Sequence, residues 1–534
     1  MEAISKQAVR VLNLLGDEDV TNVKCSVGPE QEYFLIDREQ FLQRDDLIFT
    51  GRTLFGHMPP KGQELDDHYF GTIRERQAAF MRELNDELWK LGILSKTQHN
   101  EVAPAQHEMA PIYSTANIAT DHNQLVMETM KKVARRHNFE CLLHEKPFAG
   151  VNGSGKHDNW SLVTNTGKNL LSPGKTPYDN KQFLLFLSAV IAAVDDNAAL
   201  LRMSASNPGN DHRLGANEAP PAIISIFLGE QLEDIVEQIL QNGTATHSNK
   251  GERMDIGVHT IPPIKKDATD RNRTSPFAFT GNKFEFRMVA SSMSIAGANT
   301  VLNATVADVL QSMADRMEKA DDLDKTVDEI IYETLKEHQK VIFNGNGYSD
   351  EWIAEAEKRG LPNVKTMVDA TASLLYPKTI EIFERQHVYT KTELESRAEI
   401  NYEAYAKAIN IEAKTMIHMA SKEYIPAIIS YVTSLGDSIN SISAACAEAD
   451  LSVQKDLLTT CSSLLAKAQT ALYALKDADK KANAMEEGKE QAEFFRDTVF
   501  TAMADLRAPI DELEMIVDKE YWPVPSYGDM LFEV

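Results

Sequence analysis

Two acidic residues stand inside an otherwise apolar segment near the start of the chain. The segment GPEQEYFLID, residues 28–37, reads as a β-strand because Tyr, Phe, Leu and Ile favour a pleated, buried surface. Side chains alternate along a strand, so Glu30 and Glu32 point to the same face. Neighbouring carboxylates repel each other, so this face either lies in solvent or holds polyvalent cations between the acids. Any fold for this chain must satisfy one of these two requirements.

Composition excludes several classes of protein. The length of 534 residues is enough for about two to four ordinary domains, or for one large core with additions. Acidic residues outnumber basic ones by 80 to 55, and the resulting net charge of −25 argues against nucleic acid as the main partner. The first 20 residues form an amphipathic pattern of mixed charge rather than a signal peptide, and no uninterrupted apolar run reaches bilayer length. We therefore expect no membrane partner.

The cysteines indicate the compartment. They show neither the spacing of a metal site nor that of a disulfide framework, which favours a reducing, cytoplasmic location. We expect all four to be small core residues: Cys25, Cys141, Cys446 and Cys461.

Helical periodicity marks two elements in the first third of the chain. Residues 72–93 place four apolar side chains on one stripe, with Gly92 as the cap; these are Phe80, Leu84, Leu88 and Leu91. Residues 121–140 form a second predicted helix, with Thr120 or Asp121 as its N-cap. The segment between them is too rich in Pro and polar residues to be one regular element.

The rest of the chain divides into a loop-rich part and a helical part. Residues 150–288 are rich in Gly, Asn and Pro and interleave with the strand-like segments PPAIISIFL and KFEFRMVAS, so we expect functional loops here. The pattern turns helical from Ala296 and is almost purely helical after Lys391. We therefore predict two domains, residues 1–390 and 391–534, the second serving packing or assembly.

Three further clusters carry residues suited to catalysis. HNEVAPAQHEMAP holds Glu101 and Glu108, GVNGSGKHDNWSL is centred on His157, and NKFEFRMV places Glu285 and Arg287 on one face of a strand. Each has a structural explanation alone, such as a hydrogen-bonded loop histidine or a cross-strand ion pair. Their common position in Gly- or Pro-flanked strand ends and loops favours a shared site.

One segment imitates a nucleotide-binding motif. GVNGSGKH nearly matches the P-loop pattern, but His157 occupies the position of the hydroxyl residue that would bind magnesium. The flanking segments also do not read as a buried strand before and a helix after. We reject the P-loop interpretation.

Five motifs together resemble one enzyme family. GPEQEYF, HNEVAPAQHE, NGSGKHDNWSL, HRLGANEAPPAI and KFEFR stand in the chain order of the glutamine synthetase catalytic domain, and their details are similar to its long, type III branch. The resemblance covers about residues 20–390. It implies an α+β fold, in which an antiparallel β-sheet funnel flanked by helices holds two divalent metals at its waist, followed by an all-helical C-terminal region.

The resemblance assigns metal ligands. It implies that Glu32, Glu101 and Glu108 hold the first ion, and that Glu30, His157 and Glu285 hold the second. Oxygen ligands with one imidazole suit Mg²⁺ or Mn²⁺. On this interpretation, the two acids of the first strand serve neighbouring ions.

The resemblance also implies a two-step ligation. ATP phosphorylates the glutamate side chain to give γ-glutamyl phosphate, and ammonia then displaces phosphate to give glutamine. The implied glutamate-binding residues are Asn152, Gly153, Arg213 and Arg287; those for ATP are Ser161 and Lys283; the catalytic residues are Arg273 on the phosphate side, Glu218 on a loop that closes over the intermediate, and Tyr69 at the ammonium site. The family forms stacked rings, commonly two hexamers, so we expect a homo-oligomer.

The sequence departs from the family pattern in three places. Relatives carry an arginine where this chain has Ala278, so its phosphate contact either comes from another residue, with Arg271 as the candidate, or is missing. An insertion of unknown role covers about residues 230–265. The family also places a small β-rich domain before the catalytic one, and only about 25 residues precede the first ligand strand here, so we expect impaired ammonia use and weaker ring assembly.

Two alternatives to a glutamate–ammonia ligase remain. The same fold could ligate glutamate to another amine, although the NEAPP loop and Tyr69 favour ammonia. The chain could also be a catalytically incomplete fragment or scaffold. The presence of all six metal-ligand positions argues against a scaffold, and the short N-terminal segment argues for one.

Overall fold

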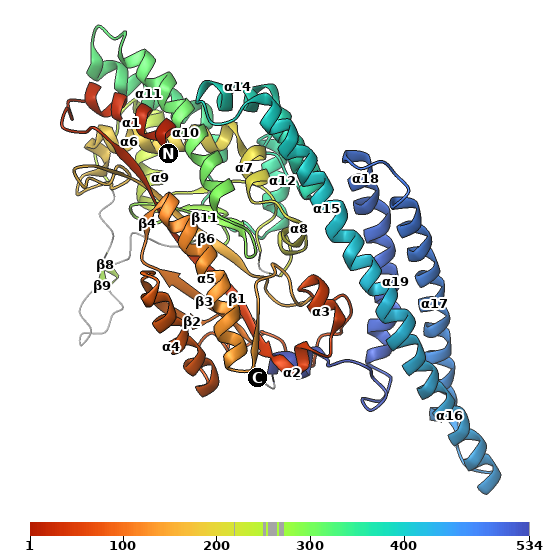
Figure 1. Cartoon of the computed structure of the whole chain (residues 1–534). Coiled ribbons are helices and arrows are strands. Elements are labelled where there is room, and N and C mark those ends of the chain that lie inside the picture. Colours follow the sequence, from red (N-terminus) through yellow and green to blue (C-terminus); the bar gives the residue numbers. More distant parts are fainter. Residues whose placement is uncertain (218, 249–252, 255–263, 266–271, 533–534) are drawn as a thin grey trace.

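A computed structural model describes residues 1–217, 219–248, 253–254, 264–265 and 272–532 (Figure 1). Its centre is the strand β1 (Val23–Asp37), which confirms the strand predicted from the first motif. β1 lies inside a nine-stranded sheet of order β2-β3-β1-β6-β11-β10-β7, with β4 and β5 also paired to β1. All described pairings in this sheet are antiparallel except β10 with β7.

The other strands are short. Their bounds are β2 (Ser95–Asn100), β3 (Gln106–Pro111), β4 (Ser114–Thr115), β5 (Phe139–Leu142), β6 (Gly155–Thr164), β7 (Ile226–Phe227), β10 (Phe277–Phe279) and β11 (Phe284–Ala290). A separate two-stranded ribbon joins β8 (Arg253–Met254) to β9 (Ile264–Lys265).

Helices cover both faces of the sheet. On one face, α4 (Glu75–Lys90) and α5 (Ala116–Arg136) bury Tyr33 and Leu35 of β1 (Figure 1). The same face of β1 continues through Val23, Cys25 and Val27 into a larger core with α1 (Glu2–Leu14), α6 (Lys181–Asp196) and α10 (Ala296–Met317). On the opposite face, Phe34 and Ile36 pack against α20 (Tyr527–Phe532). Because β1 alternates, the face that carries Glu30 and Glu32 is the one away from α4 and α5.

The remaining helices connect these layers. They are α2 (Arg38–Phe41), α3 (Asp45–Thr50), α7 (Ala198–Ser204), α8 (Pro208–Arg213), α9 (Glu230–Asn242), α11 (Leu323–His338), α12 (Asp350–Lys358), α13 (Met367–Thr371) and α14 (Pro377–Arg385).

The two helices predicted in the first third exist, with corrected ends. α4 buries Phe80, Leu84 and Leu88, but Leu91 lies beyond the last turn and is 49% exposed. α5 begins at Ala116, earlier than predicted, with Thr115 at the N-cap position. Thr120 is therefore inside the helix, where its hydroxyl donates to the Ala116 carbonyl at 2.6 Å instead of capping a terminus.

The sequence analysis missed α6 within the loop-rich segment. Its residues are buried on nearly every side, so the helix shows no polar stripe that would reveal its period. Among the described residues, no single helix is long and apolar enough to cross a bilayer; the pair α6 and α7, bent by 81° between them, reaches that length and composition.

The C-terminal part is built from long helices. α15 (Lys391–Met419) begins with a capping box between Thr390 and Glu393 and continues through a π-helical turn into α16 (Ile425–Ala445). α17 (Ser452–Ala482), α18 (Lys489–Phe494) and α19 (Phe500–Glu514) run alongside, and α20 (Tyr527–Phe532) returns to the sheet (Figure 1). Cys446 is exposed at the end of α16, which corrects the expectation that all four cysteines are buried.

A buried ion pair ties α15 to the loop after α3. Arg52 donates to both carboxylate oxygens of Glu412, from Nε at 2.8 Å and from Nη2 at 2.7 Å. Both residues are at least nine-tenths buried, so loss of one partner would leave the other charge without compensation. We expect Glu412→Met to reduce the free energy of unfolding by about 3–5 kcal/mol.

The check is the shift of the unfolding midpoint in urea. The double variant Arg52→Met/Glu412→Met removes both charges and should recover much of that loss. Equal destabilisation by the single and double variants would contradict this account.

Candidate active site

A cavity of about 240 Å³ opens on the carboxylate face of the sheet. Most of the residues proposed from the sequence line it. They are Glu30, Glu32, Tyr69, Glu101, Glu108, Asn152, Gly153, His157, Arg213, Arg273, Glu285 and Arg287. Acids and arginines that are up to 257 residues apart in the chain therefore share one cavity.

The register of the sheet explains how the acids meet. Glu30 lies opposite His157 across the β1–β6 pair, and Glu32 lies opposite Glu108 across the β1–β3 pair. Glu285 lies opposite Asn159, two residues from His157 on the same face of β6. Directly opposed residues in an antiparallel sheet share a face. Four adjacent strands thus deliver one row of polar side chains.

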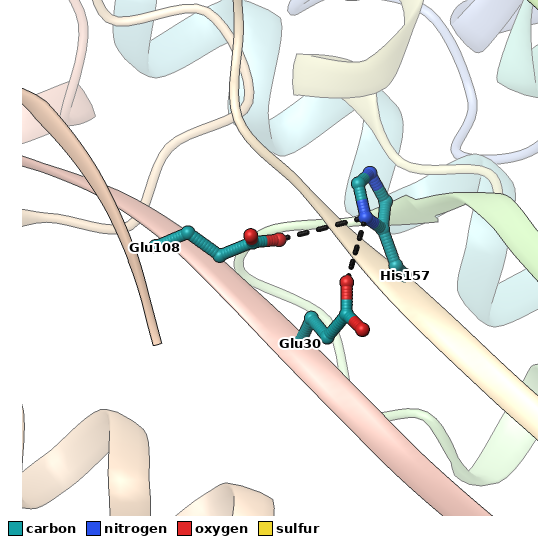
Figure 2. Close-up of side chains that lie close together, drawn as sticks. All are labelled: Glu30, Glu108 and His157. Carbon is teal, nitrogen blue, oxygen red and sulfur yellow. Dashed lines mark hydrogen bonds and ion pairs between the residues drawn. The ribbon is translucent and has the colours of Figure 1, made fainter. Parts of the chain in front are cut away.

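His157 stands at the centre of this row. Its Nδ1 atom is 3.0 Å from Glu30 Oε2, 3.3 Å from Glu285 Oε1 and 3.5 Å from Glu108 Oε1. Its Nε2 atom is 3.8 Å from Glu32 Oε1. Figure 2 shows Glu30 and Glu108 directed at the imidazole from two different strands. Four carboxylates around one ring make this the most acidic part of the cavity.

The close packing of acids changes their proton affinities. Burial raises the pKa of Glu101 to about 8, with repulsion from Glu32 and Glu108 adding to it. Burial likewise raises the pKa of Glu108. Burial opposes the charge on His157, but its hydrogen bond to Glu30 and the surrounding carboxylates raise its pKa to about 10. Without a cation, groups of this cluster therefore stay protonated near neutral pH, because neighbouring carboxylates would otherwise repel one another.

The donor set fits two divalent cations. Glu30, Glu108 and His157 bring ligand atoms within 4.8 Å of one another, and His99, Glu101 and Glu108 do the same. The buried Glu108 Oε1 accepts no hydrogen bond from the described residues, so it is available as a ligand. Carboxylate oxygens with few nitrogens suit Mg²⁺ or Mn²⁺ better than zinc.

His99 is a cavity residue that sequence reasoning passed over. Its Nε2 atom is 2.8 Å from Glu108 Oε2 and its Nδ1 atom is 3.6 Å from Glu101 Oε1. The hydrogen bond to Glu108 outweighs burial and raises the pKa of His99 to about 9. The signal was present, because His99 and Glu101 follow the same two-residue alternation as Glu30 and Glu32.

Glycines make room for Arg213 at the opposite wall. A Cβ atom at Gly155 would lie 2.3 Å from Arg213 Nη2, and one at Gly153 would lie 2.2 Å from the Glu145 carbonyl oxygen and 3.0 Å from Arg213 Cγ. The glycines of the NGSG motif therefore make room for an arginine side chain and do not form a phosphate-binding loop. The motif leads directly into the strand β6 and not into a helix, which agrees with the rejection of the P-loop interpretation.

Two further arginines face the cavity. Arg287 donates from Nη2 to Glu285 Oε2 at 2.8 Å, and its buried Nε has no hydrogen-bond partner among the described residues. Arg273 is exposed and donates from Nη2 to the Tyr69 hydroxyl at 3.2 Å. Arginine N–H groups that lack an acceptor, next to a row of acids, suit a ligand that carries anionic groups of its own.

The loop of Asn152 and Gly153, predicted to bind glutamate, is held from outside the cavity. Gln63 makes two hydrogen bonds with Asn152: it accepts from the backbone N–H at 2.9 Å and donates to Oδ1 at 2.8 Å. These contacts fix both the backbone and the side chain of a residue that lines the cavity.

The two residues predicted to contact ATP lie away from the acid row. Ser161 is four residues beyond His157 on β6, roughly 13 Å along the strand. Its hydroxyl donates to the Asn282 carbonyl at 2.8 Å, in the turn that also carries Lys283. Neither lines the 240 Å³ cavity.

Parts of the sequence predictions fall outside the described residues. Glu218, Arg271 and most of the segment between β8 and β9 belong to this group. Within the predicted insertion, the structure describes α9 and the β8–β9 ribbon. Ala278 is buried on β10 opposite Glu285, so a small side chain stands beside the acid row at the position where an arginine was expected.

Comparisons with known proteins match the chain to one family over its whole length. A family model described as the glutamine synthetase catalytic domain matches residues 6–223, and one described as the glutamine synthetase C-terminal domain matches residues 326–443. The chain is 47% identical over 541 residues to a glutamine synthetase of Butyrivibrio fibrisolvens, covering 100% of this chain and 76% of that protein. It is 44% identical over 543 residues to a type-3 glutamine synthetase of Dictyostelium discoideum, covering 100% of this chain and 73% of that protein.

A solved structure described as ligand-free GmaS also aligns. It covers 76% of this chain and 72% of its own, with a TM-score of 0.46 and 16% sequence identity.

Proposed function

This chain belongs to the glutamine synthetase family and is a glutamate–ammonia ligase, and we propose that the cavity on the carboxylate face of β1 is where ATP, glutamate and ammonia react. The observation that carries this assignment is the meeting of the acid row with three arginines in one cavity. Phosphoryl transfer needs cations for the nucleotide and donors for the transferring group.

The acid row would hold two Mg²⁺ or Mn²⁺ ions. Glu32, Glu101 and Glu108 are the proposed ligands of one ion, and Glu30, His157 and Glu285 those of the other. His99 contacts the first set and is a candidate to orient it or to join it. When bound, the ions would neutralise the phosphate oxygens of ATP.

The reaction proceeds in two displacements. An oxygen of the glutamate side chain attacks the γ-phosphorus of ATP, so that a P–O bond forms while the bond to ADP breaks. Ammonia then attacks the acyl carbon, a C–N bond forms, and phosphate leaves. The ammonium ion must first lose a proton, for which Glu218 is the proposed base.

Residues of this chain would bind and position the substrates. Arg287 and Arg213 would bind the glutamate carboxylates, together with the loop of Asn152 and Gly153. Arg273, already in contact with Tyr69, would face the transferring phosphoryl group. The turn that contains Lys283 accepts a hydrogen bond from Ser161, farther along the sheet than the acid row. This turn would bind the nucleotide.

A turnover assay tests the function. Glutamate, ATP and ammonia with Mg²⁺ should yield glutamine and phosphate in equal amounts. Preferred turnover with methylamine in place of ammonia would indicate a different glutamate–amine ligase, and no phosphate release would indicate a scaffold. We also propose a cytoplasmic homo-oligomer of stacked rings, for which light scattering after size exclusion should give a mass of about twelve chains.

Metal binding should release protons. The raised pKa values of Glu101 and His157 mean that both groups carry a proton near pH 7 in the ion-free cluster, whereas a bound cation requires both to be deprotonated. Binding of Mn²⁺ at pH 7 should therefore release about one to two protons, and the apparent affinity should rise with pH and fall as protons compete at lower pH.

Isothermal titration in two buffers of different ionisation enthalpy measures this release. A variant outside the cluster, such as Glu87→Gln on α4, where Glu87 pairs with Lys90, should leave it unchanged. A binding heat that is independent of the buffer, with a flat pH profile, would contradict the proposed ligands.

A further inference from the structure

Lys146 is a buried lysine that the mechanism above does not use. Its side chain is 7% exposed, and no carboxylate of the described residues lies within ion-pairing distance of Nζ. Nζ donates instead to the Val151 carbonyl and, at 2.9 Å, to Asn217 Oδ1. Burial and the nearby Arg213 lower the pKa of Lys146 to about 8. A buried ammonium without a counterion is costly, so its neutral hydrogen-bond partners need to be held in place.

Asn217 is bound on both sides of its amide. Oδ1 accepts from Lys146, and Nδ2 donates to the Gly150 carbonyl at 3.1 Å. Its backbone has a φ of +40°, a left-handed conformation that asparagine tolerates better than most residues. Asn217 lines the cavity and directly precedes Glu218 in the chain.

The partners on the other side belong to the loop predicted to bind glutamate. Gly150 and Val151 lead directly into Asn152 and Gly153, which line the same cavity. Gly150 has a φ of +85°, and a Cβ atom there would lie 2.6 Å from Met58 Cγ, so the backbone packs here where no side chain would fit. Two hydrogen bonds thus join segments that are more than 60 residues apart, and the local bond from Lys146 to Val151 holds the lysine in place.

We propose that Lys146 is a positioning residue that clamps the Asn217 segment to the loop of residues 150–153 and thereby keeps water from the acyl phosphate. The inference rests on the proposed function, because γ-glutamyl phosphate is a mixed anhydride. If water replaces ammonia, a C–O bond forms at the acyl carbon, the bond to phosphate breaks, and glutamate is regenerated. ATP is then consumed without glutamine.

A merely structural lysine would behave differently. Its loss would lower phosphate release and glutamine formation together, because the whole cavity would be less well ordered. Loss of the clamp should change their ratio, since phosphoryl transfer continues while the intermediate is exposed to water. The ratio of phosphate to glutamine therefore separates the two roles.

The test compares Lys146→Met with Asn217→Gly in the full chain. Methionine keeps much of the lysine volume without the charge, and glycine keeps the positive φ while removing the amide. Asn217 is exposed, so we expect its substitution to have little effect on the stability of the fold. Lys168→Met is the matched control, because Lys168 pairs with Asp17 on the surface.

We expect kcat for glutamine to fall about tenfold in each variant, as hydrogen bonds to a charged group are lost, while the KM for ATP changes less than about twofold. Phosphate should exceed glutamine severalfold, and the double variant should add little to either single one. The control should match the wild type.

Three results would overturn the clamp. Phosphate and glutamine could fall in parallel, both could stay at wild-type values, or the double variant could be fully additive. A wild-type chain that makes no glutamine would instead overturn the proposed function, and the clamp with it.

Discussion

Glu30→Gln should lower the rate of glutamine formation by roughly a thousandfold and weaken Mn²⁺ binding by about a hundredfold. The substitution keeps the shape of a side chain whose Oε2 lies 3.0 Å from His157 Nδ1 and whose Oε1 accepts from Asn159 at 3.0 Å. It removes one negative charge at the point where four carboxylates meet. Mn²⁺ titration and a glutamine assay on the same preparation measure both effects.

Asp158→Asn is the matched control. Asp158 is the residue next to His157 on β6, but alternation directs it to the opposite face, where it is fully buried. Burial raises the pKa of Asp158 to about 7, so a neutral amide is a close substitute for its protonated form. Normal Mn²⁺ binding by Glu30→Gln, or loss of binding by Asp158→Asn, would show that the wrong face of the sheet has been assigned.

Arg287→Lys should raise the KM for glutamate by roughly 30- to 100-fold while leaving the KM for ATP within about twofold. Arg287 has a buried Nε without a partner in the described part of the chain, and its Nη2 donates to Glu285 at 2.8 Å. Lysine can retain one such contact, but it cannot present two parallel donors to a carboxylate.

Initial rates at varied glutamate and varied ATP separate the two affinities. Arg38→Lys serves as control, because Arg38 pairs with Glu140 at the far end of β1. Equal increases in both KM values for Arg287→Lys would mean that the guanidinium supports the strand β11 rather than the substrate.

Local alternation made the acid row predictable. Glu30 with Glu32, and Glu285 with Arg287, each lie two residues apart on a strand, so their shared faces follow from strand geometry. The resemblance supplied the order in which the strands contribute, and the family and fold it implied are confirmed. The roles assigned to individual site residues stay predictions.

Other features depended on long-range packing that no local pattern encodes. The helix α6 is buried on nearly every side and has no polar face, so its period is hidden. Alternation places His99 and Glu101 on one face, but the contact of His99 with Glu108 depends on the β2–β3 register. The hydrogen bonds of Lys146 and Gly150 with Asn217 join two segments whose meeting is set by the packing of two loops.

The pairing of β1 with late strands has a consequence for synthesis. Glu30 leaves the ribosome early, but Glu285, its neighbour across His157, is made 255 residues later. At a synthesis rate of about 5–20 residues per second, roughly 13–50 s pass between the synthesis of Glu30 and that of Glu285. During that interval β3 and β6 follow β1 and bring Glu108 and His157, but the row stays incomplete until β11 is made. The proposed metal site can therefore be completed only after more than half of the chain has been made, well after its first strand has emerged.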